Sequence, residues 1–156
     1  MPERAGSRTT RTAGEFPGPR GPLRRFGLAE VYNPSMLPTL RPGDRLVVHY
    51  GGRVRPGHVV VLRHPLQHDL LIVKRLVARH GAAGWWVQGD NPAVRNDSRE
   101  FGAVPDAMVL ARAWLRVRPR CPAPGRRQGS LLPLLTWALS AVRPLVPRPA
   151  SRFRAR

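Results

Sequence analysis

The sequence predicts an all-β fold, either a small barrel or a pair of curled sheets, and three observations support this prediction. Short runs of β-branched and aromatic residues alternate with clusters of Gly, Pro and Asp from about residue 27 to residue 117, as in short strands joined by turns. No segment before residue 130 has a helical spacing of apolar residues. The 156 residues contain no internal repeat, which favours one domain over an array.

Six strands are expected from this pattern, at residues 28–32, 45–49, 58–63, 70–78, 85–88 and 108–117. Turns are expected where Pro, Gly, Asp or Asn cluster, at residues 41–44, 55–57 and 89–92. Side chains alternate along a strand, so Lys74 should share a face with Ile72 and Leu76. Arg75 should then lie on the opposite face.

The segments on either side of this domain differ in composition. Residues 1–26 are rich in Gly, Pro, Arg and Thr without an apolar period, so we expect them to be disordered and to hold no membrane anchor. The folded domain should cover residues 27–117, followed by a Pro/Arg/Gly linker at 118–130 and an apolar, then basic tail at 131–156. Residues 131–142 are too short to span a bilayer unaided. They predict either an interfacial helix or a helix packed on the barrel.

The net charge of +18 is concentrated in these flanks. Residues 1–26 carry +4, residues 27–115 carry +4 and residues 116–156 carry +10. Basic tails suit contact with an anionic membrane surface or with nucleic acid, and they also occur simply as solvated tails. The single cysteine, Cys121, excludes an intrachain disulfide and a multi-cysteine zinc site.

Two residues point to chemistry. Lys74 is the only lysine among 27 basic residues, and a desolvated lysine can be neutral near pH 7, whereas arginine stays protonated. Ser35 comes after the first predicted strand, between Pro34 and Pro38, which restrict the loop and fix where the hydroxyl points. A serine beside a neutral amine is a nucleophile with its general base. Taken alone, Ser35 is better explained as a turn serine and Lys74 as a strand lysine that extends to solvent.

Five ordered segments together resemble the type I signal peptidase family of Ser–Lys endopeptidases. The resemblance covers about residues 28–115. The segments are residues 35–40 (SMLPTL), 43–44 (GD), 55–61 (RPGHVVV), 73–75 (VKR), and 89–91 (GDN) with 97–102 (DSREFG). One such segment alone would be a weak signal, but five in the same order at compatible spacing are a strong one.

The resemblance implies a β-rich catalytic domain that cleaves peptide bonds after small side chains and needs no metal or cofactor. Ser35 would be the nucleophile and Lys74 the general base. The oxyanion hole would be formed by the backbone N–H of Ser35 and by Asn33, whose amide can donate a hydrogen bond as the family's usual serine does. Asp97 and Arg99 match a structural ion pair near the site, and two residues apart on an extended segment they would face the same way.

The chain departs from the family pattern at several positions. Arg95 stands where a serine usually orients the lysine, His58 replaces an acidic residue, and residues 78–81 lack a Gly-rich continuation. We also expect no N-terminal membrane anchor. The small, anchorless form resembles a branch that matures nickel superoxide dismutase by removing its propeptide, as do residues 26–31, 62–65 and 84–92.

This branch implies a protein precursor as substrate, bound as an extended peptide. We expect a cytoplasmic enzyme, with weak contact at the inner membrane surface through the arginine-flanked tail. The alternative enzyme function is a type I signal peptidase that cleaves secretory signal peptides.

Two other functions have some support in the sequence, metal binding and nucleic-acid binding. His64, His68 and Asp69 have a spacing that would bind a metal on a helix, but Pro65 breaks that helix, so no metal site is expected. Trp85-Trp86 and the arginines are compatible with a basic nucleic-acid-binding module. The small charge of the central domain argues against it, and because strand side chains alternate, one of the two tryptophans should enter the core.

Overall fold

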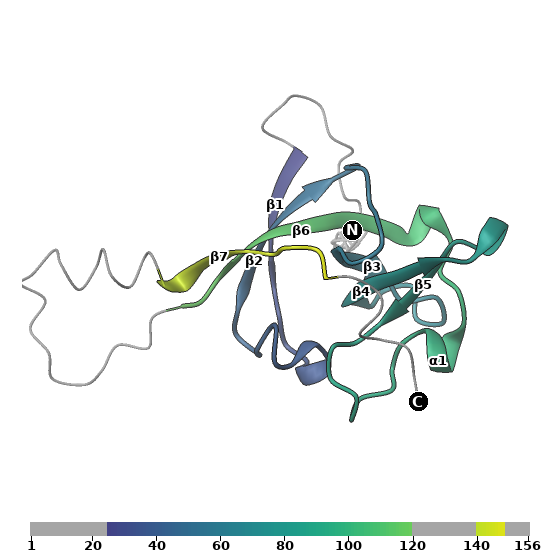
Figure 1. The fold of residues 1–156 in the computed structure, drawn as a ribbon, viewed down its shortest axis with the longest axis horizontal. Coiled ribbons are helices and arrows are strands. Elements are labelled where there is room, and N and C mark those ends of the chain that lie inside the picture. Colours follow the sequence, from purple (N-terminus) through teal and green to yellow (C-terminus); the bar gives the residue numbers. More distant parts are fainter. Residues whose placement is uncertain (1–24, 120–139, 149–156) are drawn as a thin grey trace, which may run out of the picture.

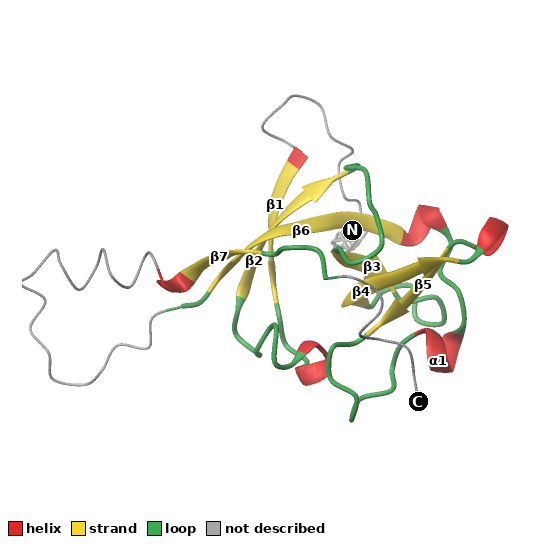
Figure 2. Ribbon diagram, in the orientation of Figure 1, coloured by secondary structure: helices red, strands yellow, loops and turns green. Residues whose placement is uncertain are grey.

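The structure, a computed structural model, describes residues 25–119 and 140–148. Its strands are β1 (Phe26–Glu30), β2 (Arg45–Tyr50), β3 (Val59–Arg63), β4 (Leu71–Arg79), β5 (Trp85–Gln88), β6 (Val109–Val117) and β7 (Val142–Pro144). The helical elements are short: the 3-10 turns Pro34–Met36, Gly81–Ala83 and Asp106–Met108, and α1 (Ser98–Phe101). Strands dominate the described residues, which confirms the all-β prediction (Figure 2). All six predicted strands are present, with ends shifted by two residues or fewer.

The strands form one antiparallel sheet in the order β1-β2-β6-β3-β4-β5, with β7 added to β6. The long strand β6 joins the two halves of the sheet, as Figure 1 shows. Along one edge of β6, Val60–Leu62 of β3 pair with its first part and β7 pairs with its last part. Irregular register between β6 and both β2 and β3 bends this sheet. The described strands form one sheet and not the pair of sheets that was one of the two expectations.

Strand β3 separates two apolar clusters, which explains its uninterrupted VVVL sequence. Val59 and Val61 belong to a first core cluster with side chains from β1, β2, β6 and the loop after β1. Val60 and Leu62 belong to a second cluster with side chains from β4 and β5, and with Val104. Trp85 is buried in this second cluster, while Trp86 is half-buried. One tryptophan of the pair therefore enters the core, as predicted.

The segment 140–148 packs against the domain, a feature that the sequence analysis did not predict. Most of the helix expected at residues 131–142 lies outside the described residues; within them, Ser140 and Ala141 are helical and Val142 already begins β7. Ala141 is buried, and Leu145 packs on the first core cluster and donates its backbone N–H to the Trp114 carbonyl at 2.8 Å. Within the described residues no helix is long and apolar enough to cross a membrane.

Candidate active site

Ser35 lies in the 3-10 turn Pro34–Met36, in the loop between β1 and β2. The loop is anchored from below, because Met36 and Leu40 are completely buried in the first core cluster. The Leu40 N–H donates to the Met36 carbonyl at 2.9 Å and so closes the next turn. Ser35 itself is only 5% exposed. The loop therefore holds the serine in one place, as the two flanking prolines suggested.

The loop after β5 fastens this turn from a second side. Asn91 donates its backbone N–H to the Ser35 carbonyl at 2.9 Å and its side-chain Nδ2 to the Pro34 carbonyl at 3.0 Å. Gly89 lies so close that an added Cβ would stand 2.5 Å from the Ser35 oxygen. A glycine is therefore required at residue 89 for this close approach.

Lys74 lies in β4, 2% exposed, opposite Val60 of β3. Ile72 and Leu76 of its own face pack in the second core cluster, as the strand alternation predicted. The Arg75–Gln88 pair begins the β4–β5 ladder, so Lys74 is next to Gly89 in register. Because Gly89 also touches Ser35, and the Pro34–Met36 turn packs on β4, the structure brings the serine and the lysine to one site.

The surroundings of Lys74 favour its neutral form. Burial lowers the pKa of the Lys74 amine below its ordinary value of 10.5, because the charged form loses its hydration. The carboxylate of Asp97 opposes this shift, and the Arg99 guanidinium reinforces it. Within the described residues the amine has no ion-pair partner. The site thus holds an amine that can accept a proton, on the strand against which the Ser35 turn packs.

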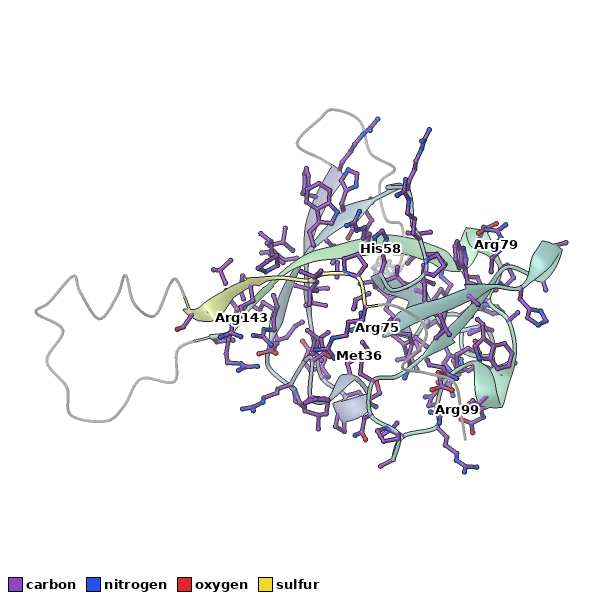
Figure 3. All side chains as sticks on the ribbon, in the orientation of Figure 1. Met36, His58, Arg75, Arg79, Arg99 and Arg143 are labelled. Carbon is purple, nitrogen blue, oxygen red and sulfur yellow. The ribbon has the colours of Figure 1, made fainter. Side chains whose placement is uncertain are left out.

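Asp97 and Arg99 form the ion pair that the resemblance implied, with Nη2–Oδ2 2.7 Å and Nε–Oδ1 2.9 Å. The expected extended segment is wrong, however, because α1 begins at Ser98 and Asp97 is its N-cap. The fully buried Asp97 carboxylate also accepts the Gly89 backbone N–H at 3.0 Å. Burial opposes its ionisation, but these hydrogen bonds, the first from Arg99, lower the pKa of Asp97 below 3.8. Figure 3 labels Arg99, which belongs to α1.

Asn33 does not have the orientation of an oxyanion donor in this structure. Its Oδ1 accepts the backbone N–H of Ser35 at 3.0 Å, so the side chain caps the 3-10 turn. The N–H expected in the oxyanion hole is therefore already occupied.

The positions where the chain departs from the family have other partners. Arg95, at the expected orienting position, is exposed, and its carbonyl accepts the Asp97 backbone N–H at 2.6 Å. Ser98, three residues further on, accepts the Val87 backbone N–H at 2.8 Å. His58 is buried and accepts the Arg55 N–H on Nδ1 at 3.1 Å. Burial, and then Arg112 and Arg55, lower the pKa of His58, so it is neutral at pH 7.

His64, from the group of His64, His68 and Asp69, has other hydrogen-bond partners. His64 Nε2 lies 3.0 Å from Asn96 Oδ1, and its Nδ1 accepts the Leu66 N–H at 3.2 Å. Within residues 25–119 and 140–148, no three His, Cys, Asp or Glu side chains gather as metal ligands would.

Sequence reasoning placed Arg75, Asp90 and Thr39 in segments of the resemblance but missed the contacts by which they support the site from the other face of β4. Arg75, almost completely buried, donates to both oxygens of Asp90 and, through Nη1, to the Gly57 carbonyl at 2.7 Å. Asp90 also accepts the Thr39 hydroxyl, from the loop that carries Ser35. The available signal was an arginine flanked by apolar residues in a predicted strand, which needs a buried partner.

Comparisons with known proteins show which family the chain belongs to. A model of the Peptidase S24-like family matches residues 10–110. The mitochondrial ATP-independent inner membrane protease subunit 1a of Arabidopsis thaliana is 32% identical, over 57% of this chain and 68% of that protein. Mitochondrial inner membrane protease subunit 1 is 29% identical in both Schizosaccharomyces pombe (60% of this chain, 74% of that protein) and Xenopus tropicalis (55% and 65%). The family match covers more than half of the chain, which therefore belongs to the Peptidase S24-like family of peptidases.

Proposed function

We propose that this peptidase is an endopeptidase with a Ser35–Lys74 dyad. The observation that carries the proposal is the buried Lys74 amine with its lowered pKa, which lies next to Gly89 in register, while Gly89 touches Ser35. Lys74 Nζ takes the proton from Ser35 Oγ as Oγ bonds to the substrate carbonyl carbon. The peptide C–N bond then breaks, and the proton passes to the leaving amine. A water molecule, deprotonated by Lys74 Nζ, then attacks the acyl carbon, the bond between that carbon and Ser35 Oγ breaks, and Oγ takes the proton from Lys74.

The substrate in this proposal binds as an extended peptide. Residues 71–74 of β4 pair with β3 along one edge. The β4–β5 ladder begins only at Arg75, so among the described residues the other edge of 71–74 has no strand partner. A peptide laid along this edge gains backbone hydrogen bonds and reaches Lys74 directly.

The finer proposal is removal of an N-terminal propeptide from the precursor of nickel superoxide dismutase. The similarity of residues 26–31, 62–65 and 84–92 to the maturation branch supports it. The alternative is cleavage of secretory signal peptides, which the relatives favour, because they are named as inner membrane proteases. The two substrates differ in sequence on the C-terminal side of the cleaved bond, so the product N-terminus distinguishes them.

Coexpression with each precursor tests the proposal. Wild-type enzyme should shorten the nickel superoxide dismutase precursor, as measured by the mass of its N-terminus, while Ser35→Ala should leave it intact with an unchanged fold. Ser140→Ala, at an exposed serine outside the Pro34–Met36 turn, is the serine control and should retain cleavage. Processing that survives Ser35→Ala would remove Ser35 as the nucleophile. Processing of a signal-peptide precursor alone would favour the alternative.

Weak contact with an anionic membrane surface is a further part of this proposal. Phe26, Leu28 and Trp114 are exposed large apolar side chains, and the rings of Phe26 and Trp114 lie 5.6 Å apart. Arg112 lies over Trp114 at 5.5 Å, so cationic and aromatic groups share one surface. Binding to vesicles that contain phosphatidylserine should be lost in high salt and weakened in Trp114→Ala. Equal binding to neutral vesicles would contradict it. The cytoplasmic location stays a prediction.

A further inference from the structure

Asn33 and Ser35 share one hydrogen bond that conflicts with catalysis. Acyl transfer at Ser35 generates a negatively charged oxygen, and the backbone N–H of the nucleophile is the donor expected to stabilise it. In this structure that N–H already donates to Asn33 Oδ1 at 3.0 Å. The developing oxyanion and Asn33 Oδ1 therefore compete for the same donor, the backbone N–H of Ser35.

A carboxamide cannot resolve this conflict without moving. It presents an acceptor oxygen at one end and a donor nitrogen at the other. While Oδ1 faces the Ser35 N–H, an incoming oxyanion would meet an oxygen lone pair instead of a donor. Catalysis thus requires Asn33 to leave the cap.

The surroundings allow the side chain to move while the backbone stays in place. Asn33 is exposed, and its backbone is extended, with φ −103° and ψ 142°. The next carbonyls along the turn are fixed, because Asn91 holds those of Pro34 and Ser35. Rotation of the Asn33 side chain towards solvent would release the Ser35 N–H without disturbing the nucleophile.

We propose that Asn33 is a positioning residue that closes the oxyanion hole of the resting enzyme, and that the substrate carbonyl opens it by replacing Oδ1. This proposal rests on Ser35 as the nucleophile. It reverses the expectation from the sequence, in which Asn33 donates to the oxyanion. A substrate bound along the whole site supplies interactions that drive the exchange, whereas a minimal substrate has few. The closed oxyanion hole therefore lowers kcat/KM most for short, poorly bound peptides.

The two roles of Asn33 predict opposite effects of substitution. Asn33→Ala removes the competing acceptor, so kcat/KM for a short fluorogenic peptide should rise about fivefold, the equivalent of one ordinary hydrogen bond. Asn33→Asp keeps the cap, cannot donate, and places a negative charge beside the developing oxyanion, so its kcat/KM should fall at least about tenfold. A longer peptide should show a smaller gain in Asn33→Ala than the short one.

Hydrogen exchange gives a readout that does not depend on activity. The measurement uses the wild type, Asn33→Ala and Asn33→Asp, each checked for an unchanged thermal transition. The residue-35 amide should be protected in the wild type and Asn33→Asp and exchange faster in Asn33→Ala. An unprotected amide in the wild type would overturn the proposal, whatever the enzyme cleaves.

The kinetic outcomes separate this inference from the proposed function. If Asn33→Ala is unchanged, or slower by about a hundredfold as after loss of an oxyanion donor, the closing role is wrong while Ser35 remains the nucleophile. If Ser35→Ala is as active as the wild type, the proposed function fails, and with it the kinetic role of Asn33. Protection of the amide would then show only a structural cap and would also overturn the proposal.

Discussion

Arg75 and Asp90 form a buried, two-pronged ion pair, with Nε–Oδ1 2.7 Å and Nη2–Oδ2 2.6 Å, directly behind Lys74. Lys74 and Arg75 are neighbours in β4 and face opposite sides of the strand. On the Arg75 side, the pair connects β4 with the loop after β5 and, through Thr39, with the loop of Ser35. On the Lys74 side lies the amine that we propose as the proton acceptor. One strand therefore both carries the proposed base and fastens the two loops of the site.

Removing Arg75 should destabilise the fold strongly. Arg75→Met leaves the Asp90 carboxylate buried without a cation, which costs about 3–5 kcal/mol in the free energy of unfolding. In Arg75→Met/Asp90→Asn the buried charge is absent, so much of that loss should be recovered. Urea denaturation of the three proteins measures both differences. A single variant as stable as the wild type would show that the pair contributes nothing to the fold.

Lys74→Met should be inactive but more stable than the wild type. The pKa of Lys74 is lowered in the fold, so at pH 7 the unfolded chain binds the proton more readily than the folded protein does, and this opposes folding. Methionine has a similar length and no charge, so the free energy of unfolding should rise by about 0.5–2 kcal/mol. Lys74→Arg should also be inactive, but it should lose stability, because arginine stays charged. Thermal and urea denaturation at pH 7, with a cleavage assay, check these outcomes. If Lys74→Met is less stable than the wild type, burial of the Lys74 amine does not oppose folding.

The rate of cleavage should increase with pH. Lys74 accepts a proton only in its neutral form, and kcat/KM reports the ionisation of the free enzyme. Because burial lowers the pKa of Lys74, the neutral fraction should grow as pH rises and reach a plateau below the ordinary value of 10.5. A pH series with a fluorogenic peptide measures this profile. A flat profile across the range in which the enzyme stays folded, or a rate that falls with rising pH, would exclude Lys74 as the base.

Much of the fold could be predicted because its signals are local. The strands come from short apolar runs ended by Gly and Pro, and β5 matched its prediction at both ends. β7 could not be predicted in this way. Val142–Pro144 has no alternating pattern, and it becomes a strand only because it pairs with Leu115–Val117 of β6, a partner distant in sequence. Tertiary contact rather than local propensity determines that strand.

The residues of the candidate site differ in how much the sequence indicates about them. Composition, strand alternation and a resemblance led to the proposal of Ser35 and Lys74 as the catalytic pair. The Asp97–Arg99 pair was anticipated, but on an extended backbone, whereas an N-cap brings the two together. Neither the role of Asn33 as acceptor nor the partner of Arg75 can be read from residue types, because each depends on side-chain direction and on contacts between separate loops.

Gly89→Ala should lower the turnover strongly and the free energy of unfolding only modestly. The added Cβ would stand 2.5 Å from the Ser35 carbonyl oxygen and 3.6 Å from the Ser35 Cβ, so the turn that carries the nucleophile must shift. A displacement of about 1 Å can reduce turnover by about a hundredfold. Gly51→Ala is the control, because it has nothing within 4 Å and strains only its own backbone, at φ +64°. It should cost about 1–2 kcal/mol of stability and keep its turnover. Equal turnover in the two variants would contradict the close approach of Gly89.

Two truncations should separate the packed C-terminal segment from the residues beyond it. Deletion of residues 140–156 removes the β7 pairs to Leu115–Val117, the buried Ala141 and the Leu145 contact with the first core cluster. The backbone groups of β6 on that edge then lose their partners, and the apolar side chains beneath Leu145 meet water. We expect a loss of several kcal/mol in the free energy of unfolding, by analogy with large-to-small core substitutions of about 2–5 kcal/mol. Deletion of residues 149–156 leaves all of these contacts in place and should change stability by less than about 0.5 kcal/mol. Urea denaturation measures both proteins. If removing residues 140–156 has as little effect as removing 149–156, the β7 segment does not stabilise the domain, and its pairing with β6 has no part in holding the curled sheet together.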